Sequence, residues 1–145
     1  MMNDAKNSKN ARASAESDGL QTQTPADVVR AFLDAMQSRD LGAARGFLSP
    51  QFVMTFPGNA RFTELEELVA WGKKRYRTIG KTYDRFDTTQ DGEEAIVYCF
   101  GTLHGTALDG TEFNDISFID RFTIRDGKVQ DQQVWNDMGE VLRSV

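Results

Sequence analysis

Three Asp-Gly dipeptides, at residues 91–92, 109–110 and 126–127, divide the second half of the chain into runs of extended character. Asp-Gly between alternating apolar residues is the strongest short signal for a β-hairpin. The runs are TYDRFDTTQ (82–90), EEAIVYCFGTLHG (93–105), EFNDISFIDRFTI (112–124) and KVQDQQVWND (128–137). The pattern therefore predicts a meander of long antiparallel strands.

The residues before this meander predict helices. Thr24 is a suitable N-cap and Pro25 suits the first helical position, and apolar residues then recur at helical spacing. A second helix is predicted over 41–48, ended by Ser-Pro at 49–50, and a strand over 51–56. Thr63 and Glu66 predict a capping box for a third helix that ends near Tyr76. We interpret the cluster KKRYR (73–77) as its cationic last turn, which needs no ligand.

Helices followed by a meander predict an α+β fold with one curved antiparallel sheet wrapped around N-terminal helices. Residues 1–23 have almost no large apolar side chains and are predicted to form a disordered tail. Residues 24–145 are predicted to form a single domain.

The composition excludes several classes of function. A net charge of −5 argues against a nucleic-acid partner, since phosphates favour a basic surface. No apolar run reaches the length of a membrane span, and the first residues do not have the pattern of a secretory signal. One cysteine, Cys99, is consistent with a reducing cytoplasm, and one histidine, His104, rules out a His-rich metal site.

Asp120 interrupts an apolar row in the third strand of the meander. The even positions from 114 to 124 include Ile116, Phe118, Phe122 and Ile124, with the carboxylate of Asp120 between them. Three-residue loops at 108–110 and 125–127 would place Asp120 opposite Tyr98 and Gln132, whereas two-residue turns would place it opposite Cys99 and Gln133. The residues alone leave both registers open.

The order of elements and three stretches of the chain carry a resemblance to a known family. The stretches are FLDAMQSRDLGAARGFLSPQFVMTFPG, GTLHG and FIDRFTIRDGKVQDQQVWND. The chain resembles the nuclear transport factor 2-like superfamily and its SnoaL-like bacterial members over residues 25–142. The resemblance implies a cone-shaped, cystatin-like domain whose sheet curls around a hydrophobic pocket. It favours the three-residue loops, which turn even-numbered residues inward. The expected ligand-binding residues are Phe32, Phe56, Trp71, Phe100, Thr102, His104, Phe118, Gln132, Val134 and Asn136, with Met36 also closing the pocket.

Such a pocket suits a small apolar or aromatic molecule. The resemblance implies a cofactor-free isomerase, dehydratase, cyclase or lyase acting on an aromatic or polyketide-like substrate, with Asp120 as the acid–base residue and Tyr98 as a hydrogen-bond donor. Asp120 also resembles the hydrogen-bond-donating acid of ketosteroid isomerases, but Phe32 and Phe56 stand at the positions of that enzyme's other two catalytic residues. The alternative is a non-catalytic module for ligand binding or dimerisation.

The odd-numbered strand residues predict a second apolar face, outside the pocket. They are Val97, Cys99, Leu103, Phe113, Ile119 and Trp135. So much apolar area on one face predicts a homodimer that packs sheet against sheet.

Overall fold

The structure, a computed structural model, describes residues 23–143. All but the last residue of the predicted tail (1–23) lies outside this range. The elements are α2 (Pro25–Gln37), α3 (Leu41–Arg45), β1 (Leu48–Phe56), β2 (Ala60–Phe62), α4 (Leu65–Lys73), β3 (Tyr76–Asp91), β4 (Glu94–Ala107), β5 (Glu112–Arg125), β6 (Lys128–Asn136) and α5 (Met138–Arg143).

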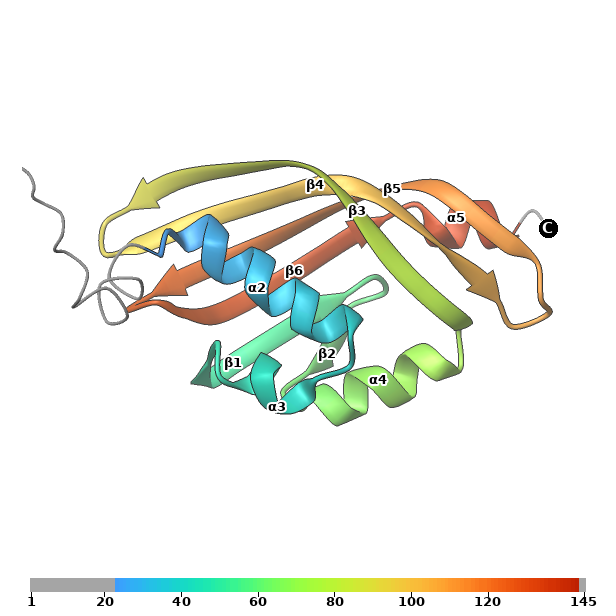
Figure 1. Ribbon diagram of the computed structural model, residues 1–145, viewed down its shortest axis with the longest axis horizontal. Coiled ribbons are helices and arrows are strands. Elements are labelled where there is room, and N and C mark those ends of the chain that lie inside the picture. Colours follow the sequence, from blue (N-terminus) through green and yellow to red (C-terminus); the bar gives the residue numbers. More distant parts are fainter. Residues whose placement is uncertain (1–22, 144–145) are drawn as a thin grey trace, which may run out of the picture.

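The predicted α+β architecture is confirmed. Six strands form one curved sheet in the order β2-β1-β6-β5-β4-β3, and α2 lies across one face of it (Figure 1). Strands β3 to β6 are the predicted antiparallel meander, with a turn at each Asp-Gly. Strand β1 extends this meander by pairing parallel to β6. Among the described residues no helix is long and apolar enough to cross a lipid bilayer.

The first helix forms as its sequence predicts. Thr24 and Asp27 exchange hydrogen bonds between side chain and backbone, which completes a capping box, and Pro25 follows the cap. Phe32 packs edge-on against Phe122 of β5 and Phe52 of β1, with ring centroids 6.2 and 6.4 Å away. Helix α2 is therefore fixed to the inner face of the sheet.

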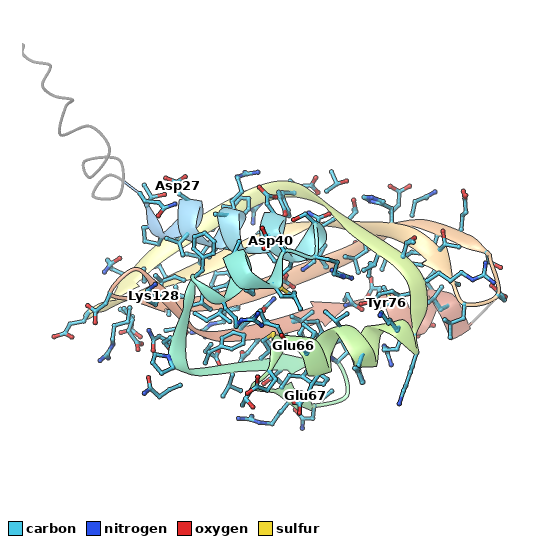
Figure 2. The ribbon with its side chains drawn as sticks, turned by 60° about the horizontal axis from the view of Figure 1, so that its bottom comes forward. Asp27, Asp40, Glu66, Glu67, Tyr76 and Lys128 are labelled. Atoms are coloured by element: carbon cyan, nitrogen blue, oxygen red, sulfur yellow. The ribbon has the colours of Figure 1, made fainter. Side chains whose placement is uncertain are left out.

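The other two predicted helices, α3 and α4, are shorter than expected. Helix α3 ends at Arg45, because Leu48 to Pro50 already belong to β1 at the edge of the meander. Helix α4 begins after Glu64, whose side chain makes no capping hydrogen bond, so the predicted box at Thr63 is wrong. It ends at Lys73, and Tyr76 stands where the chain leaves α4 and enters β3 (Figure 2).

A bulge in β5 decides which residues of β4 face inward. The predicted three-residue loop at 108–110 is present, with Ala107 N–H bonded to the carbonyl of Thr111. Beyond it, Asn114 and Asp115 are both exposed, and Asp115 has a φ of +59°, so β5 contains one extra residue. The extra residue pairs Asp120 with Cys99 and turns the odd-numbered residues of β4 inward.

The turn between β5 and β6 also differs from the prediction. Asp126 and Gly127 form a two-residue turn with φ values of +53° and +72°, as a type I′ turn requires. A second irregularity, one extra residue at Gln130 in β6, brings even-numbered residues of β6 opposite even-numbered residues of β5. Asp120 therefore pairs with Val134, and Phe122 pairs with Gln132. The even-numbered residues of β5 and β6 therefore share the inner face, as predicted, but with their pairing shifted by two residues.

This register corrects the predicted outer face. Val97, Cys99, Leu103 and Phe113 are buried in the core of the domain. Only Ile119 and Trp135 of the predicted set are exposed, at 38% and 51%. The even-numbered residues of β4 share the outer face of the sheet with Ile119 and Trp135.

Gly101 provides the space that the inner face needs at its centre. A Cβ atom here would lie 2.0 Å from the carbonyl oxygen of Thr82 and 2.9 Å from the ring of Phe118. The absence of a side chain therefore lets β3 and the Phe118 ring approach the backbone of β4.

We predict that Gly101→Ala lowers the free energy of unfolding by about 2 kcal/mol or more, because the backbone of β3 cannot yield as a flexible side chain would. Gly139→Ala is the matched control, since a Cβ at Gly139 meets nothing within 4 Å. Chemical denaturation of both variants tests this. Equal stabilities would show that the close approach at Gly101 is unimportant.

Candidate functional site

A cavity of about 110 Å³ lies between the inner face of the sheet, α2 and α4. Apolar side chains form most of its wall, and the polar groups gather at a few points. The wall is built from Phe32, Leu33, Met36, Gln37, Arg39, Phe56, Pro57, Leu68, Val69, Trp71, Arg75, Tyr76, Ile79, Gly80, Lys81, Leu103, Phe118, Asp120, Gln132, Val134, Asn136 and Met138.

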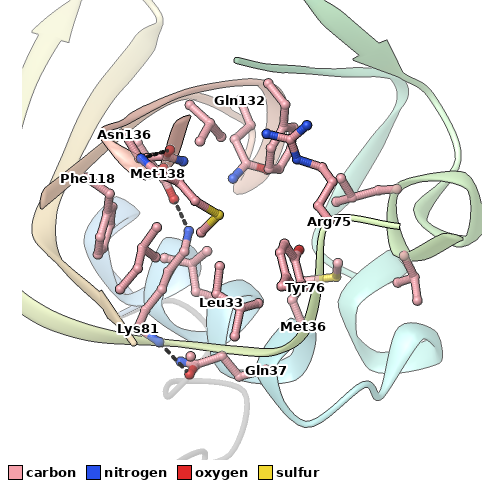
Figure 3. A pocket seen from close by; sticks show the side chains of 18 of the residues that line it. Leu33, Met36, Gln37, Arg75, Tyr76, Lys81, Phe118, Gln132, Asn136 and Met138 are labelled. Carbon is pink, nitrogen blue, oxygen red and sulfur yellow. Dashed lines mark hydrogen bonds and ion pairs between the residues drawn. The ribbon is translucent and has the colours of Figure 1, made fainter. Parts of the chain in front are cut away.

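Asp120 is fully buried on this wall and forms an ion pair with Lys81. The Nζ of Lys81 donates to Oδ2 of Asp120 (Figure 3), and the Lys81 side chain is 17% exposed. Oδ1 of Asp120 has no partner at hydrogen-bonding geometry among the described residues. A buried acceptor without a partner is rare in folded proteins and needs a functional or structural explanation.

Burial raises the pKa of Asp120 above its ordinary value of 3.8, because the ionised form loses its hydration. The charge of Lys81 and its hydrogen bond act in the opposite direction, followed by the amide of Gln132. Desolvation is the larger effect. The pKa of Asp120 is therefore higher than that of an exposed aspartate.

Lys81 is fixed by α2 as well as by the sheet. Strand β3 lies at an edge of the sheet. The backbone N–H of Lys81, on the unpaired side of this strand, donates to Oε1 of Gln37 at 3.0 Å. The Nε2 of Gln37 donates to the hydroxyl of Tyr83 at 2.8 Å, and this hydroxyl donates to Asp34 at 3.0 Å. The ammonium group also lies 4.7 Å from the centre of the Phe118 ring. These contacts hold the backbone and side chain of Lys81 in place.

Seven of the predicted ligand-binding residues, together with Asp120, lie on the cavity wall. They are Phe32, Phe56, Trp71, Phe118, Gln132, Val134 and Asn136. Met36 closes the cavity from α2, as predicted. Phe56 and Trp71 are in edge contact, with centroids 5.6 Å apart.

The predicted position of Tyr98 beside Asp120 is wrong, and so are the inward positions of Phe100, Thr102 and His104. All four lie on the outer face, because the bulge at Asp115 reverses the parity of β4. Tyr98 stacks on Phe100 with centroids 6.3 Å apart, and its hydroxyl accepts a hydrogen bond from Arg121. Leu103 takes the expected place of Thr102 and His104 on the cavity wall.

Lys81 is the residue that the sequence analysis missed. The predicted strand began at Thr82, whereas β3 begins at Tyr76. Ile79, Lys81 and Tyr83 alternate along β3, and this alternation is the signal that marks Lys81 as inward-facing.

The thiol of Cys99, also on the inner face, is less suited to acid–base chemistry than the carboxyl group of Asp120. Burial and the nearby charge of Asp120 raise the pKa of the Cys99 thiol to about 12, so it stays protonated. Among the described residues no group of three or more His, Cys, Asp or Glu side chains is placed to hold a metal ion.

Comparison with known proteins agrees with the fold described above. The sequence model of the SnoaL-like domain matches residues 29–132. No curated protein sequence matches the chain significantly.

The solved structures that resemble the chain are distant in sequence. TerC, co-crystallised with polyporic acid, is 19% identical, with a TM-score of 0.69 over 83% of this chain and 97% of its own. An NTF2-like protein of unknown function from Burkholderia pseudomallei is 21% identical, with a TM-score of 0.66 over 82% and 95%. IdmH, a candidate polyketide cyclase from Streptomyces antibioticus, is 18% identical, with a TM-score of 0.60 over 83% and 96%. At these identities the likeness establishes the fold.

We predict that Lys81→Met lowers the free energy of unfolding at neutral pH by about 3–5 kcal/mol, because it leaves the buried carboxyl of Asp120 without its partner. In an Asp120→Leu background the same change should cost much less. Chemical denaturation of the two single variants and the double variant measures the coupling.

The exposed pair of Arg85 and Asp87 provides the control, with side chains 62% and 50% exposed. Arg85→Met should cost less than about 1 kcal/mol. If Lys81→Met costs no more than Arg85→Met, the Lys81–Asp120 pair is not a buried interaction of consequence.

Proposed function

Because the chain belongs to the family of SnoaL-like domains, we propose that it is a cofactor-free acid–base enzyme acting on a small, largely apolar or aromatic molecule. The fold hosts several chemistries, so the proposal rests on the site. The observation that carries it is the carboxyl group of Asp120 on the cavity wall: Lys81 holds one oxygen, and the other has no partner at hydrogen-bonding geometry among the described residues, although the amide of Gln132 is near enough to act on the carboxyl group. A raised pKa suits such a group to proton transfer near neutral pH.

In the proposed reaction Oδ1 of Asp120 removes a proton from a carbon next to a carbonyl group. The electron pair of the broken C–H bond moves to the carbonyl oxygen, where the ammonium of Lys81 stabilises the developing negative charge. In an isomerisation Asp120 returns the proton to another carbon of a conjugated enolate. In a cyclisation the enolate carbon attacks a second carbonyl carbon of the same molecule, and Asp120 gives the proton to the oxygen of that carbonyl. Lys81 takes the donor role expected of Tyr98, and the amides of Gln132 and Asn136 orient the ligand.

The size of the cavity allows at most one ring of a ligand inside it. Its volume of about 110 Å³ is below that of a cavity of about 150 Å³ known to admit benzene. A substituted one-ring ligand therefore has to project beyond the cavity or displace side chains of the wall. A cytoplasmic location is part of this proposal, since a single cysteine suits a reducing compartment.

We predict that the protein accelerates exchange of the methyl protons of acetophenone with D2O by about 10²–10⁴-fold over buffer, which is the usual range for a positioned acid–base group. Asp120→Asn should reduce the rate to that of buffer while the fold is retained. Proton NMR of the ketone measures the exchange, and circular dichroism checks the fold.

Asp126→Asn is the matched control. Asp126 occupies an exposed turn at positive φ, a conformation that Asn also tolerates, so this variant should exchange at the wild-type rate. Undiminished exchange by Asp120→Asn would exclude Asp120 as the base. Binding of acetophenone by the wild type without exchange would favour the non-catalytic ligand-binding module.

We also propose that the chain forms a homodimer through the outer face of the sheet. Phe100, Ile119 and Trp135 pair across β4, β5 and β6, which makes a continuous apolar row on this face. The guanidinium of Arg85 covers the Phe100 ring at 4.2 Å, while Ile119 and Trp135 stay exposed. An exposed apolar row on a broad sheet supports a two-fold, sheet-to-sheet contact.

We predict that Trp135→Glu shifts the protein from dimer to monomer, because a dimer would bring two carboxylates into an apolar interface. Light scattering coupled to size-exclusion chromatography measures the mass. Leu108→Lys is the control, since Leu108 is 48% exposed but lies in the hairpin loop after β4, away from this row. A wild-type monomer, or a Trp135→Glu dimer of unchanged stability, would contradict the proposed interface.

A further inference from the structure

The cavity carries a positive charge in a chain that is negative overall. Its ionisable lining contains the cations Arg39, Arg75 and Lys81 and one carboxyl group, Asp120, whereas the net charge of the chain is −5. Asp120 is already paired with Lys81. Among the described residues no other carboxyl group on the wall compensates the charges of the two arginines, and such a concentration of one sign attracts anions.

Both arginines are held in place by contacts within the chain. Arg39 follows α2 with a φ of +60°, and its Nη1 donates to the carbonyl of Met36 in the last turn of the helix. Arg75 follows the C-cap of α4, and its guanidinium lies 4.4 Å from the centre of the Trp71 ring. Within residues 23–143, neither arginine has a carboxylate in ion-pair contact. Each guanidinium therefore keeps N–H donors that no described residue accepts.

Tyr76 lines the same cavity as both arginines. Its ring packs over Gly72 of α4, where a Cβ atom would approach the hydroxyl oxygen to 2.6 Å. Burial raises the pKa of Tyr76, and the charges of Arg39 and Arg75 both oppose this rise. Its hydroxyl forms no hydrogen bond to another residue of the described range. Figure 3 shows Arg75 and Tyr76 on the side of the cavity opposite Lys81.

We infer that Arg39, Arg75 and Tyr76 form an anion subsite, which binds the carboxylate of a small one-ring organic acid whose other end reaches Lys81 and Asp120. Two guanidinium groups and a phenolic hydroxyl supply the donors that a carboxylate accepts, in charge-assisted hydrogen bonds. The apolar wall between Lys81 and this subsite takes the ring. The inference rests on the proposed function in one respect only, that the ligand's far end is the group at which Asp120 acts.

This subsite gives the cluster KKRYR a role that its helical interpretation missed. Because α4 ends at Lys73, Arg75 and Tyr76 lie beyond the helix and turn toward the cavity, whereas Arg77 does not line it. The substrate class that follows is a cyclic or aromatic carboxylic acid with an enolisable carbonyl group away from the carboxylate. Arg77 then serves as a matched control for the charge of the cluster.

The test compares 4-acetylbenzoate with its neutral analogue 4-acetylbenzamide, which has nearly the same size and the same ketone. Isothermal titration calorimetry measures both affinities for the full chain. We expect the benzoate to bind about tenfold or more tightly, with a preference that weakens as salt increases. The Arg39→Gln/Arg75→Gln variant should lose this preference, and Arg77→Gln should retain it.

Arg75→Lys covers the possibility that the double variant is poorly folded, since it keeps the charge and should keep part of the preference. Equal affinities of the wild type for the two ligands, or no binding of the benzoate at about 10 mM, would overturn the subsite. So would an unchanged preference in the folded double variant. Proton exchange measured on the same ketones separates the two proposals: anion preference without exchange retains the subsite and rejects the acid–base function, and exchange without preference does the reverse.

Discussion

The ion pair between Lys81 and Asp120 joins the edge strand β3 to the central strand β5 over the inner face of β4. A carboxyl group that is fully buried among aromatic rings would be costly without a partner, and Lys81 supplies one. The partner is itself held by Gln37, which connects the backbone of β3 to the end of α2. The helix, the edge strand and the central strand are thus linked through a few polar contacts in an otherwise apolar interior. The same contacts leave one carboxyl oxygen without a hydrogen bond from any residue between 23 and 143 and place an ammonium group beside the carboxyl group, which is an arrangement suited to moving a proton.

The site also depends on two departures from regular strand geometry. The extra residue at Asp115 turns Cys99 and Leu103 inward and moves Tyr98 to the outer face. The irregularity at Gln130 keeps Gln132 and Val134 on the cavity wall. Bulges of this kind re-aim side chains by changing the parity of one strand. The polar content of the cavity, and therefore its chemistry, is set by two local insertions rather than by the overall topology.

The fold was largely predictable from the sequence, whereas the site was predictable only in part. The Asp-Gly turns and the apolar spacing of α2 were sufficient for the meander and the helix on its face, whereas the family was predicted from the resemblance of sequence motifs. The even parity of β5 and β6 correctly placed Asp120, Phe118 and Gln132. The parity of β4 was not predicted, because the twist and packing of neighbouring strands decide where a bulge forms, and the residue types of Asn114 and Asp115, although uncommon in strands, do not fix its position. Lys81 was missed because a strand that begins at Tyr76, directly after a helix, offers no turn signal at its start.

The central claim is that Asp120 is a buried carboxyl group whose affinity for protons is raised by its surroundings. Its most direct test is a titration of the Asp120 side-chain carboxyl carbon by ¹³C NMR, with the signal assigned from the Asp120→Asn variant. We expect a midpoint clearly above 3.8, because desolvation outweighs the charge of Lys81. A midpoint at or below 3.8 would show that the ion pair dominates, and the acid–base role of Asp120 would then lose its physical basis.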